Sequence, residues 1–157
     1  MGRETSLAQR YEANPVIKDA LGIANAAQGI QAAAKGTSPQ DDVSLLYQVV
    51  KLLDPSSAVR EGEINLQRAA RSVPTQVVGA WQKATGGHLL TPQERQNILS
   101  LVDRKIAGMK AQVEPIQRDY GRLAARVGAD SGFVARDPFE GVGQFGGVTL
   151  LKKGQKP

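Results

Sequence analysis

The sequence of 157 residues contains no cysteine and a single histidine, His88. Without cysteine the chain can form no disulfide and can use no thiolate as a nucleophile or metal ligand. One histidine per chain also excludes a metal site built from several imidazoles of one chain. Aromatic residues make up only 4% of the sequence. We therefore expect a core of aliphatic and alanine side chains, which suits closely packed helices.

Long apolar runs are missing as well. No stretch approaches the roughly 18 apolar residues of an ordinary transmembrane helix, and the polar first residues do not resemble a secretory signal. The alanine-rich stretch 16–34 could lie on a membrane surface, but its polar face carries almost no Lys or Arg, so membrane contact is not favoured. The net charge of +5 comes from scattered basic residues. It allows non-specific contact with DNA without any reading of bases.

A polar residue followed at once, or nearly so, by proline occurs five times and predicts five helix starts. The polar side chain can accept a hydrogen bond from the first turn, where proline fits because its missing N–H is not needed. We therefore expect an all-α fold of about five helices, with residues 1–13 as an N-terminal arm or short helix and residues 14–128 as the helical domain. The five starting residues are Asn14, Ser38, Asp54, Ser72 and Thr91.

The longest predicted helix begins at Pro92 and ends near Gly128, where glycine can form a left-handed cap. Its apolar residues recur at alternating steps of three and four, a heptad-like period of 3.5 that is typical of a helix packed along one seam. The seam could pack inside the chain as part of a bundle, or between subunits as a coiled coil. Pro115 removes one backbone donor but lies off the seam. The nine seam residues are Leu99, Val102, Ile106, Met109, Val113, Ile116, Tyr120, Leu123 and Val127.

After Gly128 the helical periodicity ends and glycine becomes frequent. Three phenylalanines stand six residues apart here, at Phe133, Phe139 and Phe145. Large aromatic side chains at even spacing in turn-rich sequence indicate an extended arm, residues 129–157, held by anchors. The arm could fold back on its own helices or dock on a neighbouring subunit. Residues 148–151 could form a short strand.

The clearest acidic cluster, Glu61 and Glu63, does not form a catalytic pair. Two residues apart on a helix, these side chains point about 200° away from each other, so they cannot flank one bond. Arg60 and Glu63 are three apart and are expected to form an ion pair that fixes a helix corner.

Other candidate residues also lack a chemical partner in the sequence. His88 follows two glycines with no acid or nucleophile beside it. Asp41 and Asp42 lie in the first turn of a predicted helix, where carboxylates complement the helix dipole. No phosphate-binding loop, dinucleotide fingerprint or nucleophile elbow occurs. We therefore expect no catalytic, cofactor-binding or metal-binding residues, and no enzymatic activity.

Two motifs of the sequence resemble segments of tailed-bacteriophage virion proteins. In the first, Leu46 to Glu63, one helix ends in Leu-Asp-Pro-Ser-Ser and the next continues with Val-Arg-Glu-Gly-Glu. In the second, Gly87 to Glu94, a Gly-His-Leu-Leu-Thr-Pro-Gln-Glu turn precedes a long helix. The resemblance covers roughly residues 38–125, so it leaves out the phenylalanine-bearing arm.

The resemblance implies a non-enzymatic structural component of a phage particle. The expected type is an internal or DNA-ejection protein that forms a helical oligomer near the portal–tail DNA path. Its partners would be copies of itself and the portal, tail or other ejection proteins, in the virion and, after ejection, in the host envelope. One alternative is a capsid cement or head–tail or tail adaptor protein. A second alternative is a basic helical protein that binds nucleic acid.

Overall fold

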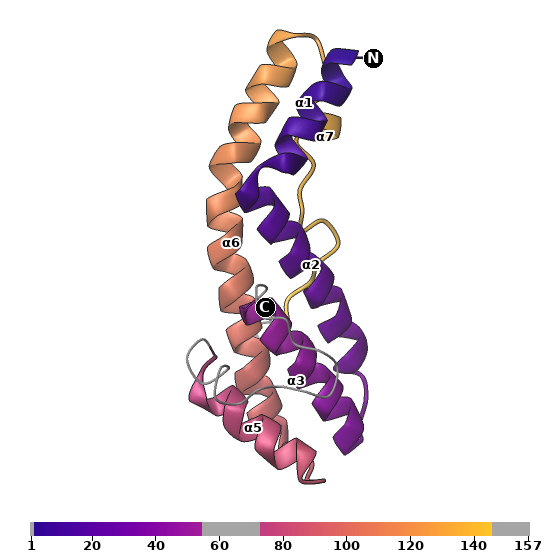
Figure 1. The fold of residues 1–157 in the computed structure, drawn as a ribbon, viewed down its shortest axis with the longest axis vertical. Helices are drawn as coiled ribbons and strands as arrows, with labels where there is room; N and C mark the ends of the chain where they lie inside the picture. Colours follow the sequence, from indigo (N-terminus) through magenta and orange to yellow (C-terminus); the bar gives the residue numbers. More distant parts are fainter. Residues whose placement is uncertain (1, 55–72, 146–157) are drawn as a thin grey trace, which may run out of the picture.

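The computed structural model describes residues 2–54 and 73–145, and the protein is all-α (Figure 1). No strand occurs in these two ranges. The helix expected to follow Asp54, the strand expected at 148–151 and the predicted pair of Arg60 and Glu63 all lie outside the described residues. The helices, labelled as in Figure 1, are α1 (Gly2–Ala13), α2 (Pro15–Ala33), α3 (Pro39–Leu53), α5 (Thr75–Thr85), α6 (Pro92–Arg126) and α7 (Ser131–Val134).

Side-chain caps begin three of these helices where the sequence predicts them. The side chain of Asn14 accepts the backbone N–H two residues on, at the start of α2. Ser38 and Thr91 each form a reciprocal capping box with the acidic residue three positions later, Asp41 and Glu94. The Ser38 hydroxyl donates to the Asp41 carboxylate at 2.7 Å and holds the pKa of that carboxyl below its usual value.

The long helix α6 is continuous over 35 residues and includes Pro115. Pro115 is exposed, so the backbone carbonyl that loses its partner there lies on the outer side of the helix. Beyond the last turn Gly128 adopts φ +71°, and the N–H of Ala129 donates to the carbonyl of Ala124 at 2.9 Å. This is the left-handed cap that the sequence predicts.

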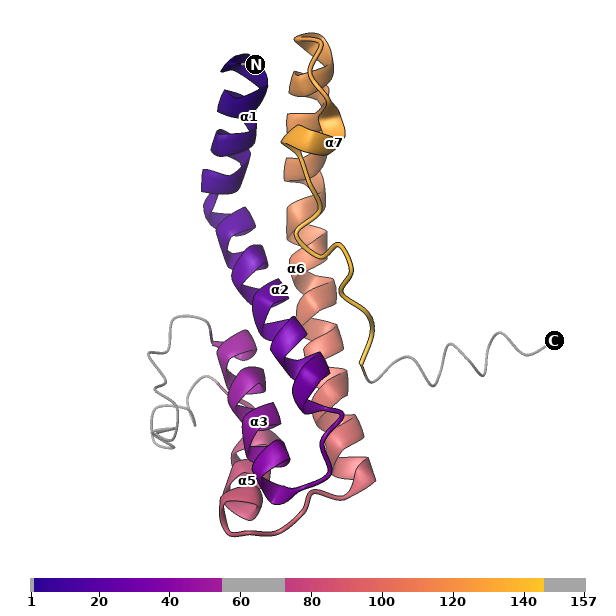
Figure 2. The same cartoon turned by 90° about the vertical axis from the view of Figure 1, so that its right-hand side faces the viewer.

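Two long limbs run antiparallel along the molecule (Figure 1). One limb is α1 followed by α2, and the other is α6. α3 and α5 pack at the end of the molecule where α6 begins, whereas α7 lies beside α1 at the opposite end (Figures 1 and 2). None of the helices in the described part of the chain is both long enough and apolar enough to cross a bilayer.

A single apolar core joins the two limbs. α2, α3 and α6 supply most of it, with Val77 and the only tryptophan, Trp81, added from α5. The aliphatic character agrees with the low aromatic content of the sequence. The largest fully buried side chains are those of Tyr11, Ile17, Ile23, Ile30, Leu45, Leu46, Val49, Leu52, Val77, Ile98, Val102 and Val113.

Tyr11 ties the first helix to the arm that follows α7. Its hydroxyl donates to the carbonyl of Arg136 at 2.8 Å, and its ring meets that of Tyr120 edge-on, with centroids 5.5 Å apart. Burial raises the pKa of Tyr11 to about 12, and the negative charge of Asp137 adds to this rise. Tyr11 of α1 and Phe139 of the arm therefore belong to the same apolar core as the helices between them.

Candidate functional site

The described residues contain neither a cluster of metal ligands nor an unpaired buried polar side chain. Within 2–54 and 73–145 no three His, Cys, Asp or Glu side chains lie close enough to hold a metal ion. Every buried side-chain nitrogen or oxygen in the same ranges has a hydrogen-bond partner. His88 is exposed in the turn between α5 and α6. Three other features stand out as candidates, namely two surfaces and one buried polar cluster.

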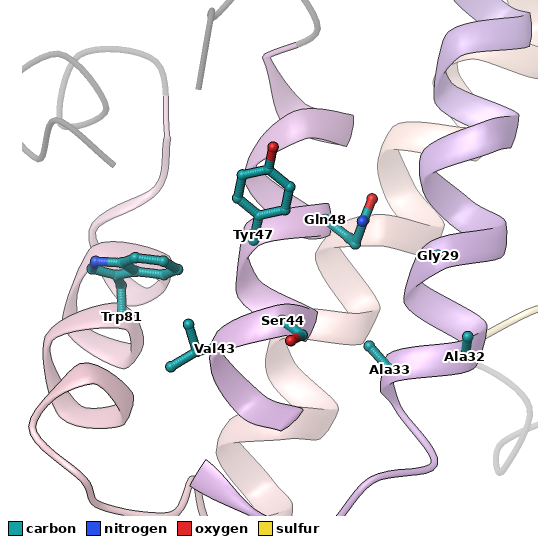
Figure 3. Close-up of a pocket in the computed structure, with 8 residues that line it drawn as sticks. All are labelled: Gly29, Ala32, Ala33, Val43, Ser44, Tyr47, Gln48 and Trp81. Carbon is teal, nitrogen blue, oxygen red and sulfur yellow. The ribbon is translucent and has the colours of Figure 1, made fainter. Parts of the chain in front are cut away.

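The first surface is a groove across α3, which we call the α3 groove (Figure 3). It has a volume of about 480 Å³. The aromatic side chains of Tyr47 and Trp81 lie on one side of it, and the small residues of α2 lie on the other (Figure 3). Its lining residues are Gly29, Ala32, Ala33, Val43, Ser44, Tyr47, Gln48 and Trp81.

Close packing explains the shape of the α3 groove. A Cβ atom at Gly29 would lie 2.7 Å from Cδ of Gln48, so only glycine lets that side chain lie across α2. The ammonium group of Lys51 stands 5.7 Å from the ring centre of Tyr47 at the rim. Small residues beside tyrosine and tryptophan are suited to receive a further helix, because backbones can approach and the aromatics supply contact area.

The second candidate is a buried polar cluster at the turn between α2 and α3. Asp42 is only 1% exposed. Its Oδ1 accepts from Nε of Arg95 at 2.9 Å, and its Oδ2 accepts from the N–H of Leu90 at 3.0 Å. Arg95 also donates from Nη2 to the carbonyl of Gly36 at 2.9 Å. The cluster joins three separate segments, namely the α2–α3 turn, α3 and the start of α6.

This cluster has a structural role rather than a chemical one. Both carboxylate oxygens of Asp42 are engaged, and the Arg95 guanidinium is directed at Asp42 and at backbone carbonyls. A Cβ atom at Gly36 would overlap the Asp41 side chain, so glycine is required where the turn passes this point. These contacts engage both oxygens of Asp42 and three of the five N–H groups of Arg95, so the cluster links the α2–α3 turn, α3 and the start of α6.

We expect Asp42→Ala to lower the free energy of unfolding by about 2–3 kcal/mol. Breaking a buried ion pair typically costs more, about 3–5 kcal/mol, but the Arg95 side chain is 22% exposed and can regain some water. Urea denaturation followed by circular dichroism measures the change.

Two further variants make that experiment specific. Asp42→Asn keeps an acceptor for the N–H of Leu90 and should lose less than Asp42→Ala. Asp119→Ala removes a carboxylate 4.0 Å from Arg122 in an exposed pair, and should change stability by less than about 0.5 kcal/mol. Equal losses for Asp42→Ala and Asp119→Ala would contradict the structural role of the cluster.

The third surface is the end of the predicted seam. The seam is buried in its middle, at Val102, Ile106, Met109 and Val113. Leu99, Ile116 and Tyr120 are partly buried against the same core.

Near the end of α6 the buried face changes, so the predicted seam does not continue inside the chain. Ala124, which is not a seam residue, is fully buried there. The seam residues Leu123 and Val127 are 42% and 44% exposed. The physical reason is that α7 packs against this end of α6 on the Ala124 side, where Ser131 donates to the carbonyl of Gly121 at 3.1 Å.

The three phenylalanines of the arm have three different environments. Phe139 is buried in the core, and Phe145 is partly buried with its N–H donating to Asp103 Oδ1 at 2.8 Å. Phe133, in α7, is 49% exposed. Up to Phe145 the arm therefore folds back on its own chain. One turn of it, Ser131–Val134, is helical rather than extended because Asp130 caps it through the N–H of Gly132 at 2.8 Å.

We define the apolar tip as Leu123, Val127 and Phe133. Leu123 is in the last turn of α6, Val127 is its C-cap and Phe133 is in α7, and the end of α6 and α7 lie at the same end of the molecule (Figure 2). The sequence places Leu123 and Val127 on the seam and Phe133 among the anchors. It does not predict that these three are exposed while other seam and anchor residues are buried.

Sequence reasoning missed the Asp42–Arg95 pair, although one signal was present. Asp42 precedes the buried Leu45 and Leu46 by three and four residues, which places it on the apolar face of α3. A carboxylate on a buried face needs a partner. The partner itself, Arg95, is 53 residues away in the sequence and could not be identified locally.

Comparison of the chain with known protein families, with curated proteins and with solved structures found no match in any of the three.

Proposed function

We propose that this chain is a non-enzymatic structural protein that assembles through its helices with copies of itself, as an internal or DNA-ejection component of a tailed-phage particle. The observation that carries the assembly part is the apolar tip. It continues the seam of α6 beyond the point where the chain's own helices cover it. The phage part is supported by the resemblance of residues 38–125 to virion segments.

The apolar tip has the chemistry of a protein-binding surface. Leu123 and Val127 are four residues apart and lie on one face of the last turns of α6. Exposed apolar side chains are common singly, but three exposed large ones at the same end of a molecule favour an interaction site. A second copy offers the same side chains, so the tips of two chains can cover each other.

Two of the basic side chains near the end of α6 have acidic neighbours. Arg118 lies 3.8 Å from Glu114, and Arg122 lies 4.0 Å from Asp119. Basic side chains that already have acidic neighbours attract a phosphate backbone less strongly than an unbroken basic stripe does. Nucleic-acid binding is therefore the weaker alternative, and steep loss of DNA affinity with rising salt in the purified protein would support it.

We expect the double variant Leu123→Asp with Val127→Asp to weaken self-association at least tenfold while leaving the helical content unchanged. The substituted carboxylates repel across a tip-to-tip contact, yet remain hydrated in the separate chain. Sedimentation velocity over a range of protein concentrations measures the association.

Ala111→Asp is the matched control, because it adds a carboxylate to an exposed position in the middle of α6. It should leave association as in the unaltered protein. A protein that stays monomeric at high concentration, or that loses association equally in both variants, would contradict assembly through the tip.

The position in the particle is tested by comparing full and emptied phage particles by mass spectrometry. An ejection protein leaves with the DNA, so the polypeptide should be present in full particles and depleted in emptied ones. A cement or adaptor protein would remain in both. Absence from both would contradict the virion proposal altogether.

A further inference from the structure

A small cavity of about 210 Å³ lies where α1 joins α2, beside the arm. Apolar side chains from three segments form its lining, and Leu21 at its edge is 40% exposed. A leucine in this position leaves apolar surface in contact with water unless something covers it. The apolar lining residues are Tyr11, Ile17, Leu21 and Pro138.

The rim of this cavity is acidic. Glu12, Asp137 and Glu140 contribute carboxylates, and Arg136 contributes one positive charge. Within the described ranges neither Glu12 nor Glu140 takes part in an ion pair. An apolar floor under an excess of negative charge suits a segment that has apolar residues followed directly by lysines.

The chain itself contains such a segment. Residues 148–157 read Val-Thr-Leu-Leu-Lys-Lys-Gly-Gln-Lys-Pro. We propose that this segment docks in the cavity of its own chain, with Leu150 or Leu151 against Leu21 and with Lys152 and Lys153 at the acidic rim. The proposal does not depend on the virion assignment.

The path of the arm brings the segment within reach. The arm runs back from α7 toward the middle of the molecule (Figures 1 and 2). It passes the cavity at Glu140 and is fixed at Phe145 by the bond to Asp103. Phe145 follows Glu140 by five positions, so the distance between their Cα atoms is at most about 18 Å.

The residues that follow Phe145 are long enough to run back over this distance to the cavity. Gly146 and Gly147 come directly after Phe145, and a pair of glycines allows a tight reversal. The six residues 146–151 can span about 20 Å. Leu151 and Lys152 can therefore reach the cavity, and the high effective concentration of a tethered segment favours docking on the same chain.

The absence of cysteine makes a direct test possible. We compare two double variants of the full chain, Leu21→Cys with Leu151→Cys and Leu89→Cys with Leu151→Cys, under mild oxidation in dilute solution. Leu21 and Leu89 are both exposed leucines, but Leu89 lies three residues before the first residue of α6, at the other end of the molecule. Docking predicts that the first pair forms an intrachain disulfide at least tenfold faster than the second.

Charge-reversal variants test whether the acidic rim attracts the lysines. Adding Lys152→Glu and Lys153→Glu should slow the first disulfide severalfold at low salt, and adding Glu12→Lys and Glu140→Lys to that variant should restore the rate. Equal rates for the two cysteine pairs would overturn the proposal. Disulfide-linked dimers whose yield rises with protein concentration would also overturn it, since they would indicate docking on a second copy.

Discussion

Met109→Asp is expected to unfold the protein. Met109 is buried in the middle of the α6 seam, one helical turn from both Ile106 and Val113. An aspartate at this position would have to bury a carboxylate without a partner, or neutralise it, and either costs several kcal/mol. Since a domain of this size is typically stable by about 5–15 kcal/mol, one such change consumes most of that stability. Far-UV circular dichroism during heating measures the loss.

Gln112→Asp is the control, because Gln112 is exposed on the same helix three residues away. It introduces the same residue type at nearly the same helix position and should change stability by less than about 0.5 kcal/mol. Lys110→Asp should be intermediate, because the Lys110 ammonium stands 5.8 Å from the ring centre of Phe139, a contact worth about 0.5–1 kcal/mol. If Met109→Asp and Gln112→Asp melted alike, the register of α6 would be wrong.

Helix starts were predictable because their causes are local. The side chains that cap α2, α3 and α6 act within three residues of themselves, so they can be identified without knowledge of the rest of the chain. The start of α5 shows the limit of this reasoning. It begins at Thr75 with Pro74 as its N-cap and without a side-chain cap, and the expected starting residue, Ser72, lies outside the described residues.

The seam was predictable in period but not in extent. The spacing of three and four correctly identifies Val102 to Val113 as a buried stripe. The spacing cannot show where along α6 the other helices of the chain stop covering the seam. That point depends on α7, which packs on the Ala124 side of the last turns and not on the seam. The sequence therefore left both seam interpretations open, and the structure assigns the middle of α6 to its own core.

The partners of the arm could not be predicted, because they are distant in the sequence. Tyr11 and Arg136, which share a hydrogen bond, are 125 residues apart, and Asp103 and Phe145 are 42 apart. Even spacing predicted that the three phenylalanines are anchors. It could not predict which of them is buried, because the burial of each side chain depends on the surface against which it packs.

Phe139→Ala is expected to lower the free energy of unfolding by about 3–4 kcal/mol. Removing a buried phenylalanine side chain loses its transfer free energy and leaves a cavity between the arm and α6. Within the arm, the Asp137 carboxylate accepts the N–H of Phe139 at 2.9 Å and fixes the turn that carries the ring. Urea denaturation of the full chain, compared by midpoint and slope, measures the change.

Phe133→Ala removes the same side chain from an exposed position of the same arm, so its stability loss should stay below about 1 kcal/mol. Its effect should appear instead in self-association, because Phe133 belongs to the apolar tip. Phe139→Ala should show the opposite pattern, with lower stability and with association preserved at temperatures where the variant is folded. Should Phe139→Ala weaken association without lowering stability, Phe139 would be a contact between subunits, and the arm would belong to the assembly rather than to its own core.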